Sequence, residues 1–522
     1  MGSAAAKEKP QVAADLAGTH GFVFVEAPKG GLGALYVKSL ASGDGAIIST
    51  PVGAPTKPAA EQFGYWLLPG RYKVTGWPNH PQADGPEFEV EAGRVTDLGS
   101  MVPVNLGGYE VVLLPVRHPE NENDLETAIA PIKALLKNPE PIRWNASSVP
   151  APATTGQRAS GLGLIADLLL AYDHKVNKPS TIQHLKDEKD PKAFLQIART
   201  VMPPLQDEPA LAPDGTAWFP ADLGTLRRRT PDGHWDSVNI DTLRQILAVE
   251  YDQGRLLAGS DDGHIRLSSD NGAHWSELKT LAPLESVIDI DHGDGTWIVV
   301  TTEKFSDPNA PRGGGLVAAM PGTQSVHMRM YSGKRDDLSD LALSKEFTLT
   351  PKDQIGWMGA RGQLFNGKYY VNAGNALERL DITSGTWTLI TPGDRVSTHY
   401  VDPKTGTLSA FWSQGAFSKV FLSMDGGDHW NQIGRPSYVI IDVQMNAPDR
   451  GWASRMNMGA FSGTWETYSF VQSKNDWDKT GEAPFSCRPM RYSADTAPIC
   501  ITTGASILGL HDGKWEVEFS AN

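Results

Sequence analysis

Three aspartates near the middle of the chain come closest to a metal-binding spacing. Asp289, Asp291 and Asp294 precede Gly295, and aspartates at alternate positions before a glycine are typical of a calcium loop. Here the order Asp-x-Asp-x-x-Asp-Gly is one position out of register with the EF-hand order Asp-x-Asp-x-Asp-Gly. We therefore interpret the segment as a turn between strands, and we expect no metal and no cofactor.

The two cysteines are the other candidates for covalent or metal chemistry. Cys487 and Cys500 stand 13 positions apart, on either side of a loop that contains Pro and Arg. This spacing allows a disulfide that closes a hairpin in an oxidising compartment, and the alternative is a pair of reduced thiols. A zinc site is disfavoured because neither cysteine has a second ligand at Cys-x-x-Cys spacing.

Two further segments stand out by composition. Gly313, Gly314 and Gly315 lack the Gly-Lys-Ser/Thr ending of a phosphate-binding loop, so we predict a hairpin turn. Residues 332–345 are rich in Lys, Arg and Asp. We expect them to form an exposed helical insertion, which is either a contact site or a solvated loop.

Two similar octads predict hairpins in the part of the chain that contains these candidate residues. They are SSDNGAHW at 268–275 and SMDGGDHW at 423–430. In such a hairpin the aspartate accepts hydrogen bonds from its own turn, the glycine adopts a positive φ, and the tryptophan fills the space between sheets. Equivalent histidines, His274 and His429, follow from the repeat and need no catalytic role. The structural residues are Ser268, Asp270, Gly272, Trp275, Ser423, Asp425, Gly427 and Trp430.

Both octads match the pattern Ser-x-Asp-x-Gly-x-x-Trp, with His where Thr is usual. The chain therefore resembles the Asp-box (BNR-repeat) β-propeller family, which has the sialidase-like fold. The resemblance implies a propeller. It leaves the activity open, because such propellers occur in sialidases, other glycoside hydrolases, sortilin-type receptors and assembly factors of photosynthetic membranes.

Weaker copies of the box give the repeat length. The tryptophans of all copies are spaced by 40, 112, 43, 47 and 38 residues, and the long gap fits two units of about 56 with one box lost near residues 328–332. Glycines precede several expected strands. We predict seven blades, with six or eight as alternatives. The tryptophans are Trp235, Trp275, Trp387, Trp430, Trp477 and Trp515, and the glycines are Gly215, Gly254, Gly295 and Gly406.

The N-terminal part has two other patterns. Short β runs between residues 21 and 115 predict an antiparallel sandwich. Its segments LLPGRYKV at 67–74 and FEVEAGRVTDLG at 88–99 resemble transthyretin-like or carboxypeptidase-regulatory-like domains, and an unrelated sandwich is the alternative. Apolar residues at helical spacing then predict helices, among them 125–136, 162–169 and 194–201.

These patterns predict a mainly β protein, with a seven-bladed Asp-box β-propeller preceded by a small β-sandwich and a helical connector. We expect a flexible tail at 1–17, the sandwich at 18–115, the connector at 116–205 and the propeller at 206–522.

Charge and hydropathy exclude some function classes. The formal net charge is −14, from 47 basic and 61 acidic residues, and Arg227–Arg229 is the basic cluster, so nucleic-acid binding is disfavoured. No segment is apolar enough to span a membrane. Ala6 stands where N-myristoylation needs Ser or Thr. The opening instead fits a secreted or lipid-anchored chain whose signal peptide was replaced by a starting Met, which predicts a periplasmic or cell-surface location.

No motif identifies an enzyme, and the catalytic residues stay unknown. A sialidase needs a Phe/Tyr-Arg-Ile-Pro motif, and the chain has no Arg-Ile-Pro. Our leading hypothesis is an extracytoplasmic binding or scaffold protein whose propeller engages a protein or glycan. The first alternative is a glycoside hydrolase with two carboxylates across a cleft. The second is an inhibitor or immunity-type protein that binds a basic enzyme.

Overall fold

The computed structural model describes most of the chain. It covers residues 13–520 except 28–31, 53–61, 79, 108–109, 137, 139, 155–181, 183–184, 205–208, 282–284, 306–324, 355–358, 361, 413–416, 437–439, 459–462, 486, 494 and 503–505. The predicted glycine turn at 313–315, the helix at 162–169 and most of the tail at 1–17 lie outside the described residues.

The chain divides into two compact units. The first comprises Met1–Thr200 with Thr242–Arg244, and the second comprises Val201–Asp241 with Gln245–Asn522. Strands dominate both units, so the prediction of a mainly β protein is confirmed. Among the described residues, no helix is both long and apolar enough to cross a bilayer. The finer division of the first 205 residues stays a prediction.

Two β-sheets form the N-terminal unit, and they share one core. The larger sheet has the order β12-β10-β9-β1-β5-β4, with β11 also paired to β9, and the smaller has the order β3-β2-β6-β7, with β8 also paired to β6. The larger sheet contains β1 (Gly21–Glu26), β4 (Thr50–Pro51), β5 (Gln62–Leu67), β9 (Val95–Gly107), β10 (Glu110–Val116), β11 (Ile142–Arg143) and β12 (Ala153–Thr154). The smaller contains β2 (Leu35–Ser39), β3 (Gly45–Ile48), β6 (Gly70–Trp77), β7 (His80–Pro81) and β8 (Glu87–Val90).

Strand β1 shows why a continuous apolar run is needed in this unit. Val23 and Val25 belong to the core shared with the smaller sheet. Phe22 and Phe24, which point to the opposite face, pack with Ile129 of helix α2 (Pro119–Lys133). A strand covered on both faces has no solvated side, so it lacks the polar alternation of a half-exposed strand. The remaining helical elements are α1 (Ala13–Leu16), η2 (Leu185–Asp187) and α5 (Pro191–Val201).

The described part of the C-terminal unit contains seven four-stranded sheets, each an antiparallel meander in chain order. We number them sheet 1 to sheet 7. Sheets 1 to 3 contain β13 (Ala210–Leu211), β14 (Ala217–Pro220), β15 (Thr225–Arg229), β16 (Trp235–Asn239); β17 (Ile246–Asp252), β18 (Arg255–Ser260), β19 (His264–Ser268), β20 (Ser276–Thr280); β21 (Ser286–Gly293), β22 (Thr296–Phe305), β23 (Ser325–Gly333) and β24 (Ala342–Leu349).

Sheets 4 to 7 follow the same plan. They contain β25 (Gly362–Phe365), β26 (Lys368–Ala373), β27 (Ala376–Asp381), β28 (Thr386–Leu389); β29 (Thr398–Val401), β30 (Leu408–Trp412), β31 (Lys419–Ser423), β32 (Asn431–Ile433); β33 (Ile440–Ala447), β34 (Arg450–Met458), β35 (Gly463–Val471), β36 (Asp476–Pro484), with the 3₁₀ turn η5 (Gln472–Lys474) between β35 and β36; and β37 (Cys487–Met490), β38 (Ile499–Thr502), β39 (Ile507–His511) and β40 (Lys514–Phe519).

Tight turns join the first two strands of several sheets. Gln253 and Gly254 both have a positive φ between β17 and β18, and so do Asp294 and Gly295 between β21 and β22. Two residues with positive φ form the turn whose twist matches that of the flanking strands. The turn glycines singled out in the sequence therefore occupy positions that most residues adopt only with strain.

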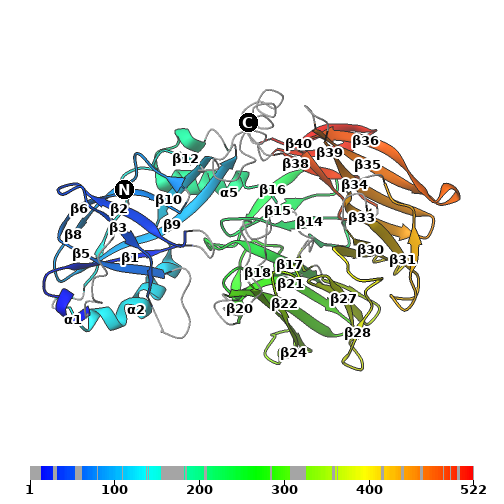
Figure 1. Cartoon of the computed structure of the whole chain (residues 1–522), viewed down its shortest axis with the longest axis horizontal. Helices are drawn as coiled ribbons and strands as arrows, with labels where there is room; N and C mark the ends of the chain where they lie inside the picture. Colours follow the sequence, from blue (N-terminus) through cyan, green and yellow to red (C-terminus); the bar gives the residue numbers. More distant parts are fainter. Residues whose placement is uncertain are drawn as a thin grey trace. The chain divides into compact units, whose positions relative to one another are not determined.

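The sheets pack in a ring as a β-propeller, so the prediction of a propeller is confirmed. The first strand of a sheet packs on that of the next, for example β17 on β21 and β29 on β33. The ring is closed by sheets 1 and 7, where Phe219 and Trp235 share an apolar cluster with Ile499 and Ile507. Figure 1 shows the green strands β14–β16 beside the orange-red strands β38–β40.

A buried ion pair joins the same two sheets. Arg229 on β15 donates two hydrogen bonds to Glu518 on β40, with N–O distances of 2.8 and 2.6 Å, and their side chains are 9% and 5% exposed. The indole of Trp235 donates a third hydrogen bond to this carboxylate. Such a bidentate contact fixes both distance and orientation, so it holds the closing sheets in register.

Candidate functional site

The two octads form nearly identical hairpins. In the first, Ser268 Oγ accepts the N–H of Gly272 at 2.8 Å, and Asp270 accepts the N–H of His274 at 2.9 Å. Ser423, Asp425, Gly427 and His429 repeat these contacts at the same distances. Both hairpins join the third and fourth strands of their sheets, in sheets 2 and 5.

The octad glycines contact the preceding sheet. A Cβ on Gly272 would lie 2.6 Å from Val238, and one on Gly427 would lie 2.6 Å from Ile390. The φ angles of the two glycines are 90° and 95°. Trp430 donates its indole N–H to the carbonyl of Ile390. The octads are therefore structural links between neighbouring sheets.

The box tryptophans mark one register along the unit. Trp235, Trp387, Trp477 and Trp515 lie in the first two positions of the fourth strand, and the octad tryptophans immediately precede it. Sheets 3 and 4 fill the 112-residue gap between Trp275 and Trp387. In sheet 3, the segment between β23 and β24 replaces the box, and Asp340 accepts the backbone N–H groups of Lys334 and Arg335.

This arrangement corrects the prediction for residues 332–345. The helical insertion is wrong: the segment contains the end of β23, a turn, and the start of β24. Leu338 is fully buried in the turn and packs in the same cluster as Trp297. The charged residues of the turn cap backbone N–H groups or pair with one another, so their charge does not require helical spacing.

The predicted turn at the three aspartates is correct for Asp294 alone. Asp294 and Gly295 form the turn, but Asp289 and Asp291 lie in the inner strand β21. Together with Glu250 of β17 they line a cavity of about 100 Å³. We call Glu250, Asp289 and Asp291 the axial acidic site. Strands β17 and β21 are neighbours across two sheets, which the sequence does not reveal.

Burial and like charges set the electrostatics of this site. Burial and the charges of Asp289 and Asp252 raise the pKa of Glu250 well above its ordinary value. Asp289 is held by the hydroxyl of Tyr369. A Cβ on Gly362 would lie 1.8 Å from that hydroxyl and 1.9 Å from the Asp289 carboxylate, so the contact requires glycine at this position. A raised carboxyl pKa in a cavity is common at functional sites.

The geometry nevertheless limits what this site does chemically. Small-molecule sites measure about 300 to 1,000 Å³, and this cavity is several-fold smaller. In the described part of the chain, no three His, Cys, Asp or Glu side chains are placed to hold a metal. The axial acidic site therefore presents carboxyl groups to a cavity that has no space for a sugar ring.

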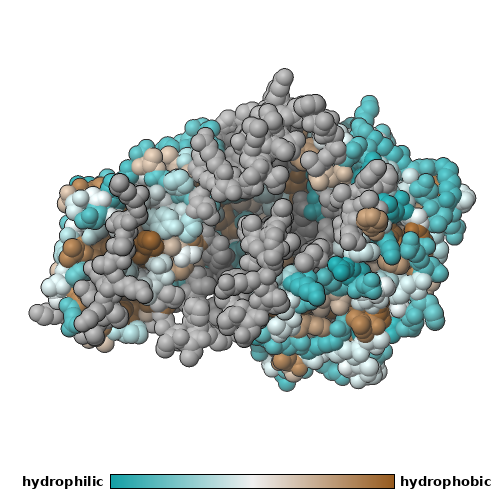
Figure 2. Space-filling view, viewed as in Figure 1, coloured by the Kyte–Doolittle hydropathy of each residue, from teal (hydrophilic) through white to brown (hydrophobic). Residues whose placement is uncertain are grey.

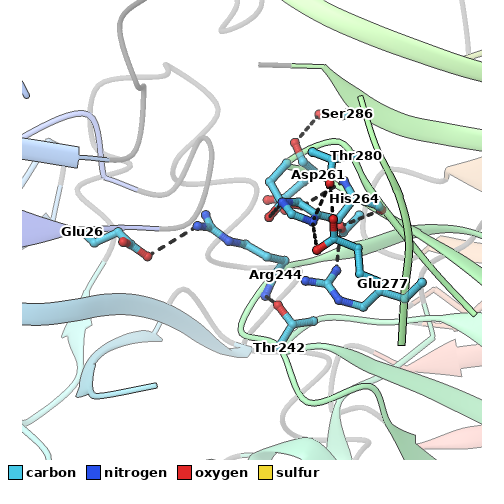
Figure 3. A network of polar contacts seen from close by, with 11 residues as sticks. Glu26, Thr242, Arg244, Asp261, His264, Glu277, Thr280 and Ser286 are labelled. Carbon is cyan, nitrogen blue, oxygen red and sulfur yellow. Dashed lines mark hydrogen bonds and ion pairs between the residues drawn. The ribbon is translucent and has the colours of Figure 1, made fainter. Parts of the chain in front are cut away.

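A serine, an aspartate and a histidine lie together at the turn between β18 and β19. Ser260 Oγ lies 2.6 Å from Asp262, and the closest contact of the His264 ring to Asp262 is 3.8 Å. His264 instead contacts Glu277 at 3.2 Å, as Figure 3 shows. A nucleophilic serine needs a hydrogen bond to its base. Ser260 instead donates to Asp262 and the His264 carbonyl and accepts from Arg266, so the group caps a turn.

Figure 3 also shows an ion pair of the N-terminal unit. Arg244 lies 3.4 Å from Glu26 of β1, and both side chains are buried. Arg199 of α5 donates to the carbonyl of Thr242 at 2.6 Å. These contacts hold Thr242–Arg244 in the N-terminal unit.

A larger cavity of about 460 Å³ also lies in the N-terminal unit. Its lining includes Arg117, Trp144 and Leu195. Arg117 donates to the Asp97 carboxylate at 2.6 Å and to the Trp144 carbonyl at 2.8 Å. Its guanidinium therefore secures the segment around Trp144 against β9 and contributes to the wall of the cavity.

The two cysteines and the basic run are also structural. Cys487 of β37 and Cys500 of β38 form a disulfide and are both fully buried. Arg227 and Arg229 of the basic run are buried on β15, and Arg228 pairs with Asp236. This run therefore offers no cationic surface for a phosphate backbone.

A different group of cations is exposed in sheet 5. Arg395 and Lys419 both lie over the ring of Trp412, at 5.7 and 5.5 Å from its centroid. We call these three residues the cation–aromatic cluster. Phe417, two residues before Lys419, is 73% exposed. No sequence pattern indicates this cluster, because its members belong to no motif and Arg395 joins it through the fold.

The cluster and the octads lie at opposite ends of the sheets. Trp412 and Lys419 are paired at the connection between the second and third strands, β30 and β31. The octads connect third and fourth strands. Because antiparallel strands alternate in direction, these two kinds of connection emerge at opposite ends. In Figure 2, the right-hand rim, where Figure 1 places β31 and β36, is mostly hydrophilic.

Comparisons with known proteins give distant structural similarity. No protein-family model matches the chain, and no curated protein matches it. The solved structures similar to it include YCF48 bound to D1 peptide, with 12% identity, a TM-score of 0.39, and coverage of 58% of this chain and 92% of that one.

Two other structures are similar at this level. The WD40 β-propeller domain of Doa1 has 11% identity and a TM-score of 0.36, and the match covers 59% of this chain and 91% of that one. The GH74 xyloglucanase from Xanthomonas campestris has 14% identity and a TM-score of 0.34, with coverage of 57% and 50%.

Proposed function

We propose that this protein is an extracytoplasmic binding or scaffold protein whose propeller engages a protein partner. In this proposal the octads are Asp boxes, the seven sheets are the seven blades, and the N-terminal unit is a transthyretin-like sandwich with its helices. The buried disulfide supports an oxidising compartment, because glutathione and thioredoxin keep cytosolic thiols reduced. A lipid anchor on the native N-terminus would be compatible with this location.

The observation that carries the proposal is the exposed aromatic and cationic surface around Trp412. Aromatic residues and arginine are enriched at protein interfaces, and they supply most binding hot spots. Phe417 has the largest exposed fraction among the large apolar side chains that the structure describes. Exposure of so large an apolar side chain two residues from Lys419 of the cation–aromatic cluster favours an interaction site over ordinary surface.

Hydrolysis of a glycan is less well supported. An inverting or retaining glycosidase needs two carboxyl groups on either side of an accessible bond. Glu250 and Asp289 face a cavity of about 100 Å³, and Asp289 is already bonded to Tyr369. No feature of the described residues favours the inhibitor or immunity alternative over a general binding role.

Site-specific cross-linking tests the proposal. A photoreactive phenylalanine analogue is placed at Phe417 in the full chain, and extracytoplasmic extract is cross-linked and analysed by mass spectrometry. Leu389, which is 65% exposed on β28, is the matched control position. We expect one protein at position 417 that is absent at position 389. Equal products at both positions, or release of reducing sugar from a polysaccharide panel, would contradict the proposal.

A further inference from the structure

Two exposed cations of the propeller, Arg395 and Lys419, lie over the same aromatic ring, that of Trp412. Neither Arg395 nor Lys419 has an ion-pair partner among the residues that the structure describes; the contact of each is with the Trp412 ring. Both side chains are exposed. In a chain of net charge −14, two uncompensated cations on one ring create a local positive site.

Lys345 provides an internal comparison. It too lies over aromatic rings, those of Phe347 and Trp387 at 4.6 and 4.8 Å. However, Lys345 pairs with the carboxylate of Glu378. The charge of Lys345 is therefore neutralised by the propeller itself, whereas the charge of the cation–aromatic cluster remains available for a ligand.

We propose that the cation–aromatic cluster binds an acidic, extended segment of a partner protein. This inference rests on the proposed binding function and specifies its partner. A carboxylate of the segment pairs with Arg395 and Lys419, and an apolar side chain beside it packs on Phe417. Charge-assisted hydrogen bonds to a carboxylate supply orientation, and burial of an exposed phenylalanine supplies apolar contact area.

The arrangement favours a carboxylate over a neutral sugar. A sugar ring that stacks on an indole competes for the ring with any cation that already lies over it, and here two cations do so. A neutral sugar that displaced a cation from the ring would not replace its cation–π attraction. A carboxylate is attracted by the same cations and can leave them over the ring.

Peptide titration of the full chain tests the proposal. The probe is the peptide acetyl-Gly-Leu-Asp-Glu-Phe-Gly-amide, and its control carries Asn and Gln in place of Asp and Glu. The chain is labelled with 5-fluorotryptophan, and the ¹⁹F resonance of Trp412 is assigned with Trp412→Phe. We expect the acidic peptide to shift this resonance, and we expect its Kd to rise when salt is raised, since screening weakens exposed charge pairs.

Matched variants locate the site. Arg395→Gln combined with Lys419→Gln should raise the Kd at least about tenfold, which is roughly 1.4 kcal/mol. Lys345→Gln, the control for a cation over aromatic rings, should leave the Kd within about twofold. Arg395 and Lys419 lie at the surface, and Lys345 belongs to a partly exposed ion pair. An unchanged melting temperature therefore confirms that each variant is folded.

Failure of this inference is distinguishable from failure of the binding function. Absence of a peptide shift, or equal binding of the amide peptide, overturns the acidic-partner proposal, and so does a Trp412 shift with a neutral oligosaccharide alone. If the protein cross-linked at Phe417 is still captured by the Arg395→Gln/Lys419→Gln variant, the binding function stands and the inference fails. If no specific protein is cross-linked to the wild-type chain, the binding function itself fails.

Discussion

The pKa of a buried glutamate is lowered at the ring closure and raised at the axial acidic site. At the closure, burial raises the pKa of Glu518, but hydrogen bonds from Arg229 and Trp235 outweigh it, and the net pKa is lowered. At the axis, the charges of Asp289 and Asp252 add to the effect of burial, and the pKa of Glu250 is raised. The charged form of a carboxyl group is therefore favoured where a cation is in contact and disfavoured where like charges surround it.

This difference predicts opposite responses to pH. A lowered folded-state pKa gives stability that is present above the unfolded value, near 4.5, and is lost as the pH falls through the folded value. A raised folded-state pKa gives stability that is present below about 4.5 and is lost as the pH rises through the folded value. Glu518 should therefore protect the propeller at neutral pH, and Glu250 should weaken it there.

Breaking the closure should have the largest effect. Glu518→Gln leaves the buried Arg229 without its counter-ion, and loss of one partner of a buried pair costs about 3 to 5 kcal/mol. We expect a loss of this size in the free energy of unfolding by urea at pH 7, with a smaller loss at pH 4. Asp495→Asn, at the exposed pair Lys404–Asp495, is the control and should leave the free energy of unfolding almost unchanged. Equal losses in the two variants would refute a special role for the closure.

The disulfide lies in sheet 7, one of the two sheets that close the ring, and links two of its strands covalently. It links strands β37 and β38 of sheet 7 across a sequence separation of 13 residues. Closing a loop of about 15 residues stabilises a protein by about 3 kcal/mol in the chain-entropy model. Cys487→Ala with Cys500→Ala should therefore lower the free energy of unfolding by about 2 to 4 kcal/mol. A denaturation midpoint unchanged from that of the oxidised wild type would count against this expectation.

The octad aspartates differ from both glutamates, because they are neither buried nor surrounded by other carboxylates. Asp270 and Asp425 are about 44% and 43% exposed, and each accepts a backbone N–H. Loss of such a carboxylate removes an acceptor of turn N–H groups that water can partly replace, so the effect should be smaller than that of breaking a buried ion pair. We expect Asp270→Ala and Asp425→Ala to lower the free energy of unfolding by similar amounts. A clearly unequal loss in the two variants would show that the two octads are not equivalent.

The axial acidic site should give the smallest effect at a single pH. Near pH 4, Glu250→Gln replaces a protonated carboxyl group by an amide of similar shape, so we expect a change of less than about 1 kcal/mol. The informative result is the slope: the free energy of unfolding should fall less steeply with rising pH in the variant than in the wild type. Parallel pH profiles in the variant and the wild type would show that the pKa of Glu250 is not raised in the folded protein.

Local features of the fold could be predicted from the sequence. The octads encode their own hydrogen bonds, because serine, aspartate and glycine within four residues satisfy one turn. The glycines before strands encode positive φ angles. The helical pattern at Leu125 and Ile129 predicted helix α2, whose apolar side packs on β1. In each case the interacting groups are close in the sequence.

Other features depend on partners that are far apart in the chain. The charged composition of residues 332–345 is compatible with an exposed helix, and only the pairing of the strands on either side shows that the segment contains a turn. Asp289 and Asp291 were assigned to a turn, although they extend an inner strand whose neighbour is β17. The contacts of Asp289 with the Tyr369 hydroxyl and with the Glu250 charge come from other sheets.

The sequence by itself determined the repeat, its turn chemistry and the register of its tryptophans, because these depend on side chains and backbone within a few residues. The tertiary structure decided which glutamate is matched by a cation and which is crowded by carboxylates. Arg229 and Glu518 are 289 positions apart, and Arg395 reaches Trp412 from a different connection. Charge and burial act through space, so a group's ionisation and its availability to a partner are set by the neighbours that the closed ring brings to it.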